Sequence, residues 1–243
     1  MKKEISVIIP CKNEERYLSK ILKFLSSQEK ITNLEIIVSI SPDTTDKTEE
    51  IARKYGARIV KGGLPATVRN KGAKHSSFDI LFFLDADTYS NSRTFLLRAL
   101  MEFNSKNLDV AGTLLSPEYK GDGLKKTFYE KLYEFENKIF VKKENSKKPK
   151  MQSGMFVRRK AFNKLNGFRE GLFGEDSDFA ERAVDKGMNF GILKKCGKLK
   201  NSVRRYEDKG ILRMLSKYTY FNLRAEIGGY NSLQGTINSY FKN

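Results

Sequence analysis

The chain has 243 residues, with 46 Lys and Arg against 29 Asp and Glu, so its formal net charge at pH 7 is +17. A hydrophobic content of 39% is enough for one packed core and argues against a disordered chain. The charge favours polyanions, anionic lipid surfaces or phosphorylated substrates as partners, although a basic surface that is simply solvated also explains it.

The first 90 residues alternate short β-branched runs with amphipathic segments, which is typical of a doubly wound α/β sheet. Strands are predicted at residues 5–9, 34–40, 57–60 and 79–84, and helices at 17–25, 45–55 and 65–75. Gly56 follows the second helix where a left-handed C-cap is favoured. Successive strand–helix units place the intervening loops at the carboxyl edge of one sheet, where such sheets bind ligands.

The second half is less regular. Helices are predicted at residues 92–105, 124–143, 161–165 and 174–186, strands at 109–115 and 155–158, and a last helix at 211–224. The helix at 124–143 carries Phe128, Leu132, Phe135 and Ile139 on one side. A basic stretch at 142–150 reads as a loop. Neither an internal repeat nor a linker is found, so residues 1–243 are expected to form one domain.

The two cysteines, Cys11 and Cys196, have no metal-type spacing, which fits reduced thiols in the cytosol. Residues 12–14 interrupt the amino-terminal apolar run, and no run of 18 apolar residues occurs. We therefore expect a cytoplasmic protein without a spanning helix, in which any membrane attachment is peripheral, at the inner face.

The predicted strand at 79–84 ends in Asp85 and Asp87, one residue apart. Such a pair suits Mg²⁺ or Mn²⁺, because these cations take oxygen ligands and fill their remaining positions with phosphate oxygens and water. An isolated Asp pair also fits a turn or a helix start. Together with the ligand-binding edge of the sheet, the pair indicates a diphosphate held by a metal ion.

Six segments in order resemble the landmarks of family 2 glycosyltransferases, over about residues 4–187: residues 5–15, 43–48, 69–73, 83–87, 154–159 and 167–176. The resemblance implies an α/β GT-A (Rossmann-like) fold with a mostly parallel central sheet flanked by helices. It also implies a metal-dependent, inverting glycosyltransferase of the hexosyltransferase type. Residues 1–115 would bind the nucleotide-sugar, residues 116–200 the acceptor, and residues 201–243 would form a helical extension.

On this resemblance Asp87 ligates the Mn²⁺ or Mg²⁺ directly, and Asp85 contacts ribose or a metal-bound water. Arg69 is similar to the arginine on the diphosphate side; as an ordinary surface residue it would pair with Asp43 or Glu14 instead. The nucleotide-sugar residues implied are Pro10, Lys12, Asn13, Glu14, Ser41, Asp43, Arg69, Asn70, Asp85, Ala86 and Asp87. Ser41 and Pro42 stand where many relatives have an acidic pair, so UDP-linked and GDP-linked donors both stay open.

Asp176, with Glu175 beside it, resembles the base that takes a proton from the acceptor hydroxyl. The alternative is an acidic first turn that complements the helix dipole. If the acceptor is a phosphate monoester, proton abstraction matters less. Arg204 and Arg205 are suited to a phosphate of donor or acceptor.

The aromatic and basic carboxyl-terminal section, which ends in Tyr240 and Phe241, suits a lipid interface, or else a helix that covers the sheet edge. The acceptor is expected to be a glycan or a lipid-linked phosphate, presented at an anionic membrane surface. A sugar-nucleotide nucleotidyltransferase is a second hypothesis, but residues 5–15 lack its Gly-rich basic loop. A basic nucleic-acid-binding module leaves the acidic pairs without a role, so no nucleic acid partner is expected.

Overall fold

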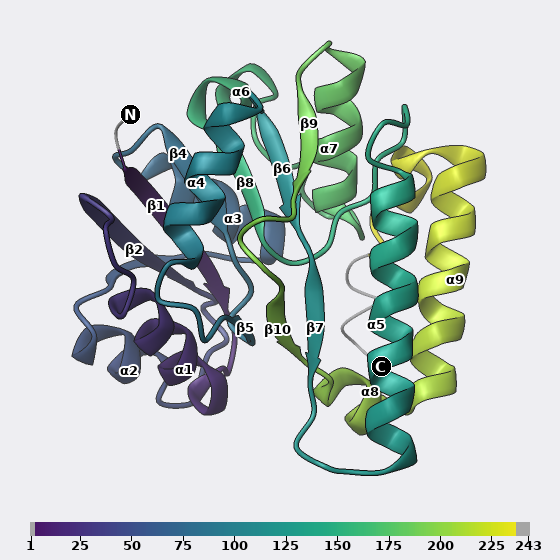
Figure 1. The fold of residues 1–243 in the computed structure, drawn as a ribbon, viewed down its shortest axis with the longest axis horizontal. Coiled ribbons are helices and arrows are strands. Elements are labelled where there is room, and N and C mark those ends of the chain that lie inside the picture. The colour runs from purple at the N-terminus through teal and green to yellow at the C-terminus, as the bar shows by residue number, and fades with distance from the viewer. Residues whose placement is uncertain (1–2, 237–243) are drawn as a thin grey trace.

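The structure is a computed structural model, and it describes residues 3–236 (Figure 1). The Tyr240–Phe241 end of the predicted tail lies outside the described residues. Within them, a seven-stranded sheet has the order β3-β2-β1-β4-β8-β6-β9. Its strands are β1 (Glu4–Cys11), β2 (Asn33–Ile40), β3 (Arg58–Lys61), β4 (Ile80–Phe83), β6 (Val110–Thr113), β8 (Met155–Arg158) and β9 (Phe190–Leu193). Neighbours are parallel except at β8, which is antiparallel to both β4 and β6.

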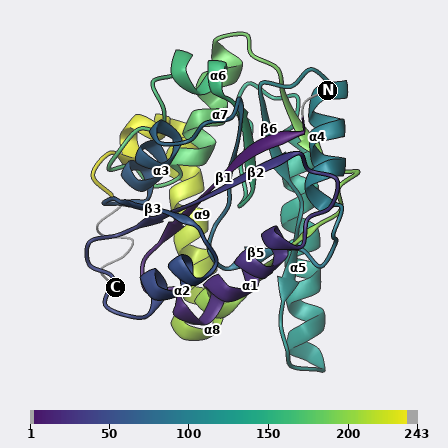
Figure 2. The ribbon, with the colours of Figure 1, turned by 90° about the vertical axis from the view of Figure 1, so that its left-hand side faces the viewer.

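Helices cover both faces of this sheet (Figures 1 and 2). Ile5, Val7 and Ile9 of β1 pack into one buried cluster with α1 (Glu15–Ser26) and α4 (Phe95–Ser105). Ile8 points to the other face, into a cluster with α3 (Pro65–Lys74), α6 (Arg159–Lys164) and α7 (Glu175–Asp185). Because both faces are covered, the central strands are mostly apolar, with buried Ser6 and Ser39 as polar exceptions.

The alternation predicted for the first half is confirmed. The expected helix at 45–55 is α2 (Thr48–Lys54), and Gly56 after it has a φ of +69°. The expected helix at 65–75 is α3, with Pro65 at its start. The observed bounds differ from the predicted ones by a few residues at the helix ends, where the caps rather than the apolar pattern decide.

The strand predicted at 109–115 is instead two strands in two sheets. β6 belongs to the large sheet, whereas β7 (Leu115–Glu118) joins a three-stranded sheet of order β5-β10-β7, with β5 (Thr88–Tyr89) and β10 (Leu199–Ser202). Asn137 fixes the start of β7, because its side chain accepts from the Leu115 N–H (3.1 Å) and donates to the Leu115 carbonyl (2.7 Å).

The long helix is α5 (Leu124–Lys142); of its expected apolar side, Leu132 is half-buried and packs against the core, but the other three residues are exposed. Phe128, Phe135 and Ile139 are 39%, 61% and 40% exposed. The buried residues of α5 are Tyr129, Tyr133, Asn137 and Phe140, one position further around the helix. Their hydrogen bonds and ring contacts with β7, β10 and Tyr206 decide the orientation, and these partners are distant in sequence.

The helix predicted at 211–224 is confirmed, and the described residues after β10 are mostly helical. They comprise α8 (Arg204–Lys209), α9 (Ile211–Gly228) and a short 3₁₀ turn at Tyr230–Leu233. α9 packs inward through Met214, Phe221 and Ala225, and Glu226 near its end pairs with Lys143 (3.1 Å) of the basic loop. Within residues 3–236, no helix combines the length and the apolarity needed to cross a bilayer.

Candidate active site

The loops after β1 and β2 are tied together at the carboxyl edge of the sheet. Asn13, in the left-handed region with a φ of +54°, accepts a hydrogen bond from the Thr45 N–H (2.9 Å). The Glu14 N–H donates to the Thr48 hydroxyl (2.8 Å). At the exposed rim, Lys12 pairs with Asp43 (3.1 Å). The sequence-predicted residues 10–14 and 41–43 are therefore brought together, with Pro10 half-buried and Ser41 buried.

Arg69 lies between two carboxylates from distant parts of the chain. Its guanidinium donates to Asp85 Oδ1 (2.8 Å) and, through the other nitrogen, to Glu175. The pairing with Asp43 or Glu14 that an ordinary surface residue would make is not the one observed, and the Arg69 side chain is only 12% exposed. Although burial opposes it, the charge of Arg69 holds the pKa of Asp85 below its usual value. Arg69 therefore links the Asp-X-Asp pair to the start of α7.

Arg204 makes a second bridge at the same edge. Its Nη2 lies 2.6 Å from Glu14 Oε1 and 3.2 Å from Asp87 Oδ2, and its guanidinium lies over the Tyr17 ring, 4.4 Å from the centroid. The other carboxylate oxygen of Glu14 is buried and finds no hydrogen-bond partner among residues 3–236. The first residue of α8 thus connects the carboxyl-terminal section directly to the loops after β1 and β4.

Asp87 is held by residues that the sequence did not single out. Asn201 on β10 donates to Thr88 Oγ1 (2.9 Å) and, more weakly, to Asp87 Oδ1 (3.4 Å), and its own oxygen accepts from the Tyr133 hydroxyl (2.7 Å). Burial raises the pKa of Asp87, and the charges of Arg205 and Arg204 only partly offset it. Because the β5–β10 pairing is non-local, nothing near Asn201 in the sequence marks it.

Asp176 and Glu175 begin α7, directly after Gly174, whose φ of +79° permits the turn. Burial, followed by the charge of Glu175, raises the pKa of Asp176 to about 7, and Arg69 limits the rise. The carboxyl group therefore changes its ionisation near neutral pH. Glu175 is instead engaged by Arg69.

A small cavity of about 10 Å³ separates Asp176 from Asp85, and Arg69, Gln152 and Ser153 also line it. The side-chain oxygen of Gln152 is buried, and the described part of the chain offers it no hydrogen-bond partner. Ser153 Oγ accepts from the Asp85 N–H at 3.4 Å. These two residues precede the landmark at Gly154 and were missed by the sequence reasoning.

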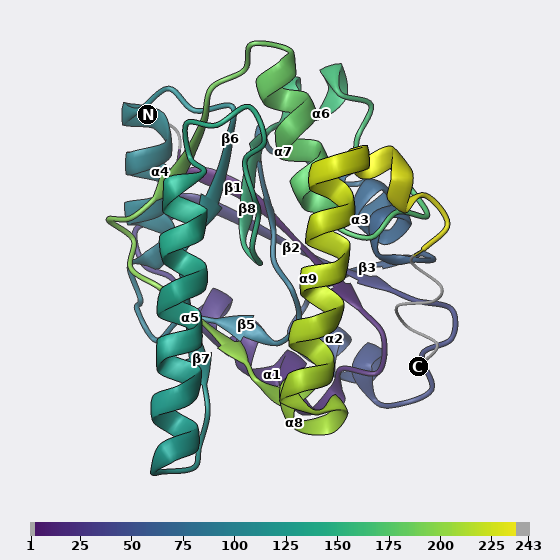
Figure 3. The same ribbon diagram turned by 90° about the vertical axis from the view of Figure 1, so that its right-hand side faces the viewer.

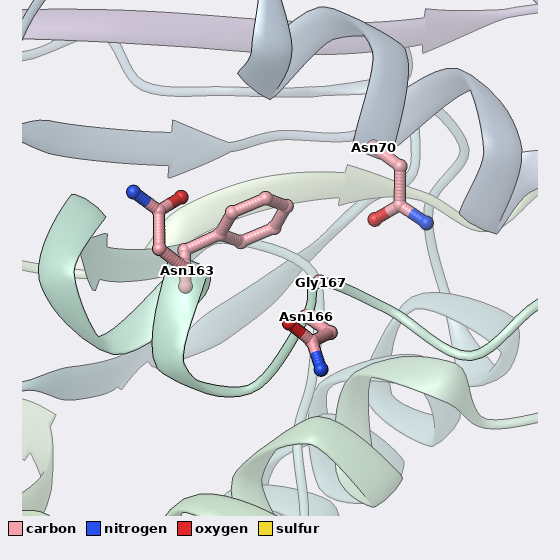
Figure 4. A pocket seen from close by; sticks show the side chains of 5 residues that line it. Asn70, Asn163, Asn166 and Gly167 are labelled. Carbon is pink, nitrogen blue, oxygen red and sulfur yellow. The ribbon is translucent and has the colours of Figure 1, made fainter.

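The Asn70 side chain holds a backbone turn in place through two hydrogen bonds. Its amide donates to the Phe168 carbonyl (2.9 Å) and accepts from the Phe168 N–H (2.8 Å), so both amide atoms are engaged by the turn at Gly167. A larger depression of about 280 Å³ lies beside it, lined by Asn70, Phe162, Asn163, Asn166 and Gly167 (Figure 4). None of these five lining residues has a titratable side chain, so they offer no acid or base.

The carboxyl edge of the large sheet carries more carboxyl groups than positively charged side chains. Among the described residues, the network comprises Glu14, Asp85, Asp87, Glu175 and Asp176, together with Arg69, Arg204 and the nearby charge of Arg205. Five carboxyl groups against three guanidinium groups leave an excess of up to two negative charges. Ala86 is buried between the two aspartates.

Within residues 3–236, no group of three or more His, Cys, Asp or Glu side chains is arranged to hold a metal ion alone. The residues nevertheless fit a divalent cation that also takes phosphate oxygens as ligands. Asp87 and Glu14 lie side by side on Arg204, and a buried oxygen of Glu14 has no partner.

A mostly parallel sheet covered on both faces, with paired carboxylates and arginines at its carboxyl edge, defines a protein of the GT-A class. The family model described as "Glycosyl transferase family 2" matches residues 6–165, and the chain therefore belongs to that family. The matched segment includes Glu14, Arg69, Asp85 and Asp87 and ends before α7.

Solved structures share the fold at low sequence identity. Staphylococcus aureus TarS 1-349 in complex with UDP-GlcNAc superposes with a TM-score of 0.65 at 20% identity, over 82% of this chain and 58% of that one. The mannosyltransferase PcManGT from Pyrobaculum calidifontis, in complex with GDP-Man and Mn²⁺, gives a TM-score of 0.65 at 17% identity, over 82% and 56% of the two chains.

Two curated relatives match by sequence. The 4,4'-diaponeurosporenoate glycosyltransferase of Staphylococcus haemolyticus is 40% identical over 101 residues, which are 36% of this chain and 25% of the relative. Glycosyltransferase AglE of Haloferax volcanii is 27% identical over 196 residues, covering 76% of this chain and 62% of the relative. The chain thus spans less than two thirds of either relative.

Proposed function

We propose that this chain transfers a sugar, with inversion, from a nucleotide-diphosphate donor to an acceptor hydroxyl or phosphate, with Mn²⁺ or Mg²⁺ at Asp87. The observation that supports it most is the double bridge at the sheet edge, in which Arg69 and Arg204 hold Asp85, Asp87 and Glu14 together. An edge with this mixture of anions and cations suits a diphosphate and its metal ion.

On the donor side, Asp87 would ligate the cation and Asp85 would contact ribose or a metal-bound water. When bound, the cation would supply positive charge to the departing diphosphate. Arg69 and Arg204 are placed to add fixed positive charge at the same edge. Residues 10–14 and 41–43 would form the floor of the nucleoside pocket. Since relatives of this fold are in complex with UDP-GlcNAc and with GDP-Man, either base remains a candidate.

On the acceptor side, Asp176 rather than Glu175 is the proposed base. Its pKa of about 7 suits proton transfer near neutral pH, whereas the Glu175 carboxylate is engaged by Arg69. For a hydroxyl acceptor, kcat should therefore fall below about pH 7 as Asp176 takes up a proton. The acceptor would be a glycan or a lipid-linked phosphate that the enzyme meets as a peripheral protein at the inner membrane surface.

Thermal-shift measurements with UDP, GDP, dTDP and CMP, each with and without Mn²⁺, test the donor site. One diphosphate should stabilise the protein only when Mn²⁺ is present. Asp87→Ala should abolish that shift. Asp176→Asn should keep it and lose transfer, while Asp185→Asn, an exposed change on the same helix, should keep both. A metal-independent shift, or one retained in Asp87→Ala, would contradict the proposed site.

A further inference from the structure

Exposed apolar side chains are concentrated on α5 and α9. Of the large hydrophobic residues exposed by more than a third among residues 3–236, only Leu64 and Met101 lie outside these two helices. On α5 they are Leu124, Phe128, Phe135, Ile139 and Val141, and on α9 they are Leu212, Tyr220, Leu223 and Ile227. Leu124 and Ile227 are 91% and 88% exposed, so the core does not explain them.

The spacing of most of these exposed residues places them along one side of each helix, where they form an apolar stripe. At about 100° per residue, Leu124, Phe128, Phe135 and Ile139 fall within about 60° around α5. Leu212, Tyr220, Leu223 and Ile227 fall within about 80° around α9. On both helices the stripe lies away from the buried residues, so each helix has a second apolar face that residues 3–236 leave exposed. We refer to these eight residues as the α5–α9 face.

Basic residues border both stripes. Lys131, Lys138 and Lys142 are exposed and follow one edge of the α5 stripe, whereas Glu130 and Glu134 lie about 110° or more from its centre.

On α9, Arg213 and Arg224 border the stripe. The acidic residue of that helix, Glu226, is already paired with Lys143 (3.1 Å) and Lys150 (3.5 Å). An apolar centre with a basic border is the pattern of helices that lie in the interface of an anionic bilayer.

The two helices stand on the same side of the molecule, in front of the sheet in Figure 3. α9 follows α8, whose Arg204 reaches Asp87 and Glu14. A surface that binds α9 would therefore also hold the segment that completes the candidate active site.

We propose that the α5–α9 face binds the surface of an anionic lipid bilayer, with the apolar stripes inserted at the headgroup level and the basic borders on the lipid phosphates. The proposal extends the proposed function, because it gives the face at which a lipid-linked acceptor would be met, but its argument comes from α5 and α9 alone. A second copy of this chain is a poorer partner, because it would bring two sets of Lys and Arg together in a protein of net charge +17.

Vesicle sedimentation of the full chain tests this without donor or transfer. The protein should sediment with vesicles of phosphatidylcholine and phosphatidylglycerol in equal parts, and not with phosphatidylcholine alone. Phe135→Ser/Ile227→Ser should lower the apparent affinity about tenfold or more, since two apolar anchors are lost. Met101→Ser, at a side chain on α4 that is 53% exposed, should stay within about twofold of the wild type.

The basic borders are tested separately. Lys138→Glu/Arg213→Glu should reduce binding about tenfold, whereas Lys54→Glu on α2 should have little effect. Absence of sedimentation, or equal binding by the wild type and Phe135→Ser/Ile227→Ser, would overturn the proposal. A wild-type dimer in light scattering that becomes monomeric in that variant would overturn it in favour of self-association. The nucleotide thermal shift should be unchanged in both double variants, so a failure here is distinct from a failure of the donor site.

Discussion

Asp176 is expected to cost the folded protein stability, and removing its charge should stabilise the chain. Burial and Glu175 raise its pKa from 3.8 to about 7. The folded protein therefore binds this proton more tightly than the unfolded chain does, and the associated stability is lost as the pH rises from about 4 through about 7. A shift of three pKa units corresponds to about 4 kcal/mol in the free energy of unfolding. Because the Asp176 side chain is partly exposed, we expect about 2–4 kcal/mol.

Asp176→Asn removes the ionisable group while keeping the shape of the side chain. Above about pH 8 the variant should be more stable than the wild type by about 2–4 kcal/mol, and near pH 5 the gain should shrink to about 1–2 kcal/mol because Asp176 is then protonated when folded. Urea unfolding followed by circular dichroism at both pH values measures the two differences. Asp185→Asn on the same helix controls for the loss of a negative charge.

The same variant should lose transfer activity, so stability and activity should change in opposite directions. A variant that is less stable than the wild type near pH 8 would show that the folded protein does not disfavour the ionised form of Asp176. A stability gain that is equal at both pH values would show that the protonation of Asp176 does not cause the gain.

Two further predictions concern the arginine bridges. Arg69→Met should destabilise the protein by about 2–4 kcal/mol in urea unfolding, because it leaves the buried Glu175 and the half-buried Asp85 without their cation. Arg53→Met at an exposed pair should have little effect, and similar costs for the two variants would mean that the Arg69 bridge is not structural. Arg204→Met should strengthen Mn²⁺ binding to the nucleotide-free protein several-fold in calorimetry, because Arg204 and the cation compete for Asp87. An unchanged Mn²⁺ affinity would show that the two do not compete.

Much of the donor half could be predicted because its signals are local. Apolar runs alternate with helical periodicity in residues 4–90, and parallel strands place their carboxyl ends at one edge, so Glu14, Asp85 and Asp87 were expected to lie together. Arg69 was expected beside them from the family resemblance. The structure brings them together, while their roles in binding and catalysis stay predictions. The pairing pattern was not foreseen: Arg69 with Glu175, and Arg204 with Glu14 and Asp87.

The predictions that were wrong or incomplete concern features that are set by contacts between residues distant in the sequence. The apolar pattern of α5 correctly showed an amphipathic helix, but it could not show that Tyr129, Tyr133 and Phe140 would find ring and hydrogen-bond partners while Phe128 and Phe135 stay exposed. Likewise, one apolar run at 109–115 gave no sign that its two ends join different sheets. The support of Asp87 by Asn201 depends on that second sheet and was missed for the same reason.

The central claim is that a divalent cation and a nucleotide diphosphate bind together at the carboxyl end of β4. Anomalous diffraction from crystals grown with Mn²⁺ and the diphosphate selected by thermal shift tests it most directly. We predict one manganese peak within coordination distance of an Asp87 oxygen and of the diphosphate, with Arg204 moved away from that carboxylate. A bound nucleotide whose diphosphate lies away from Asp85 and Asp87, or a manganese peak at other residues, would contradict the account.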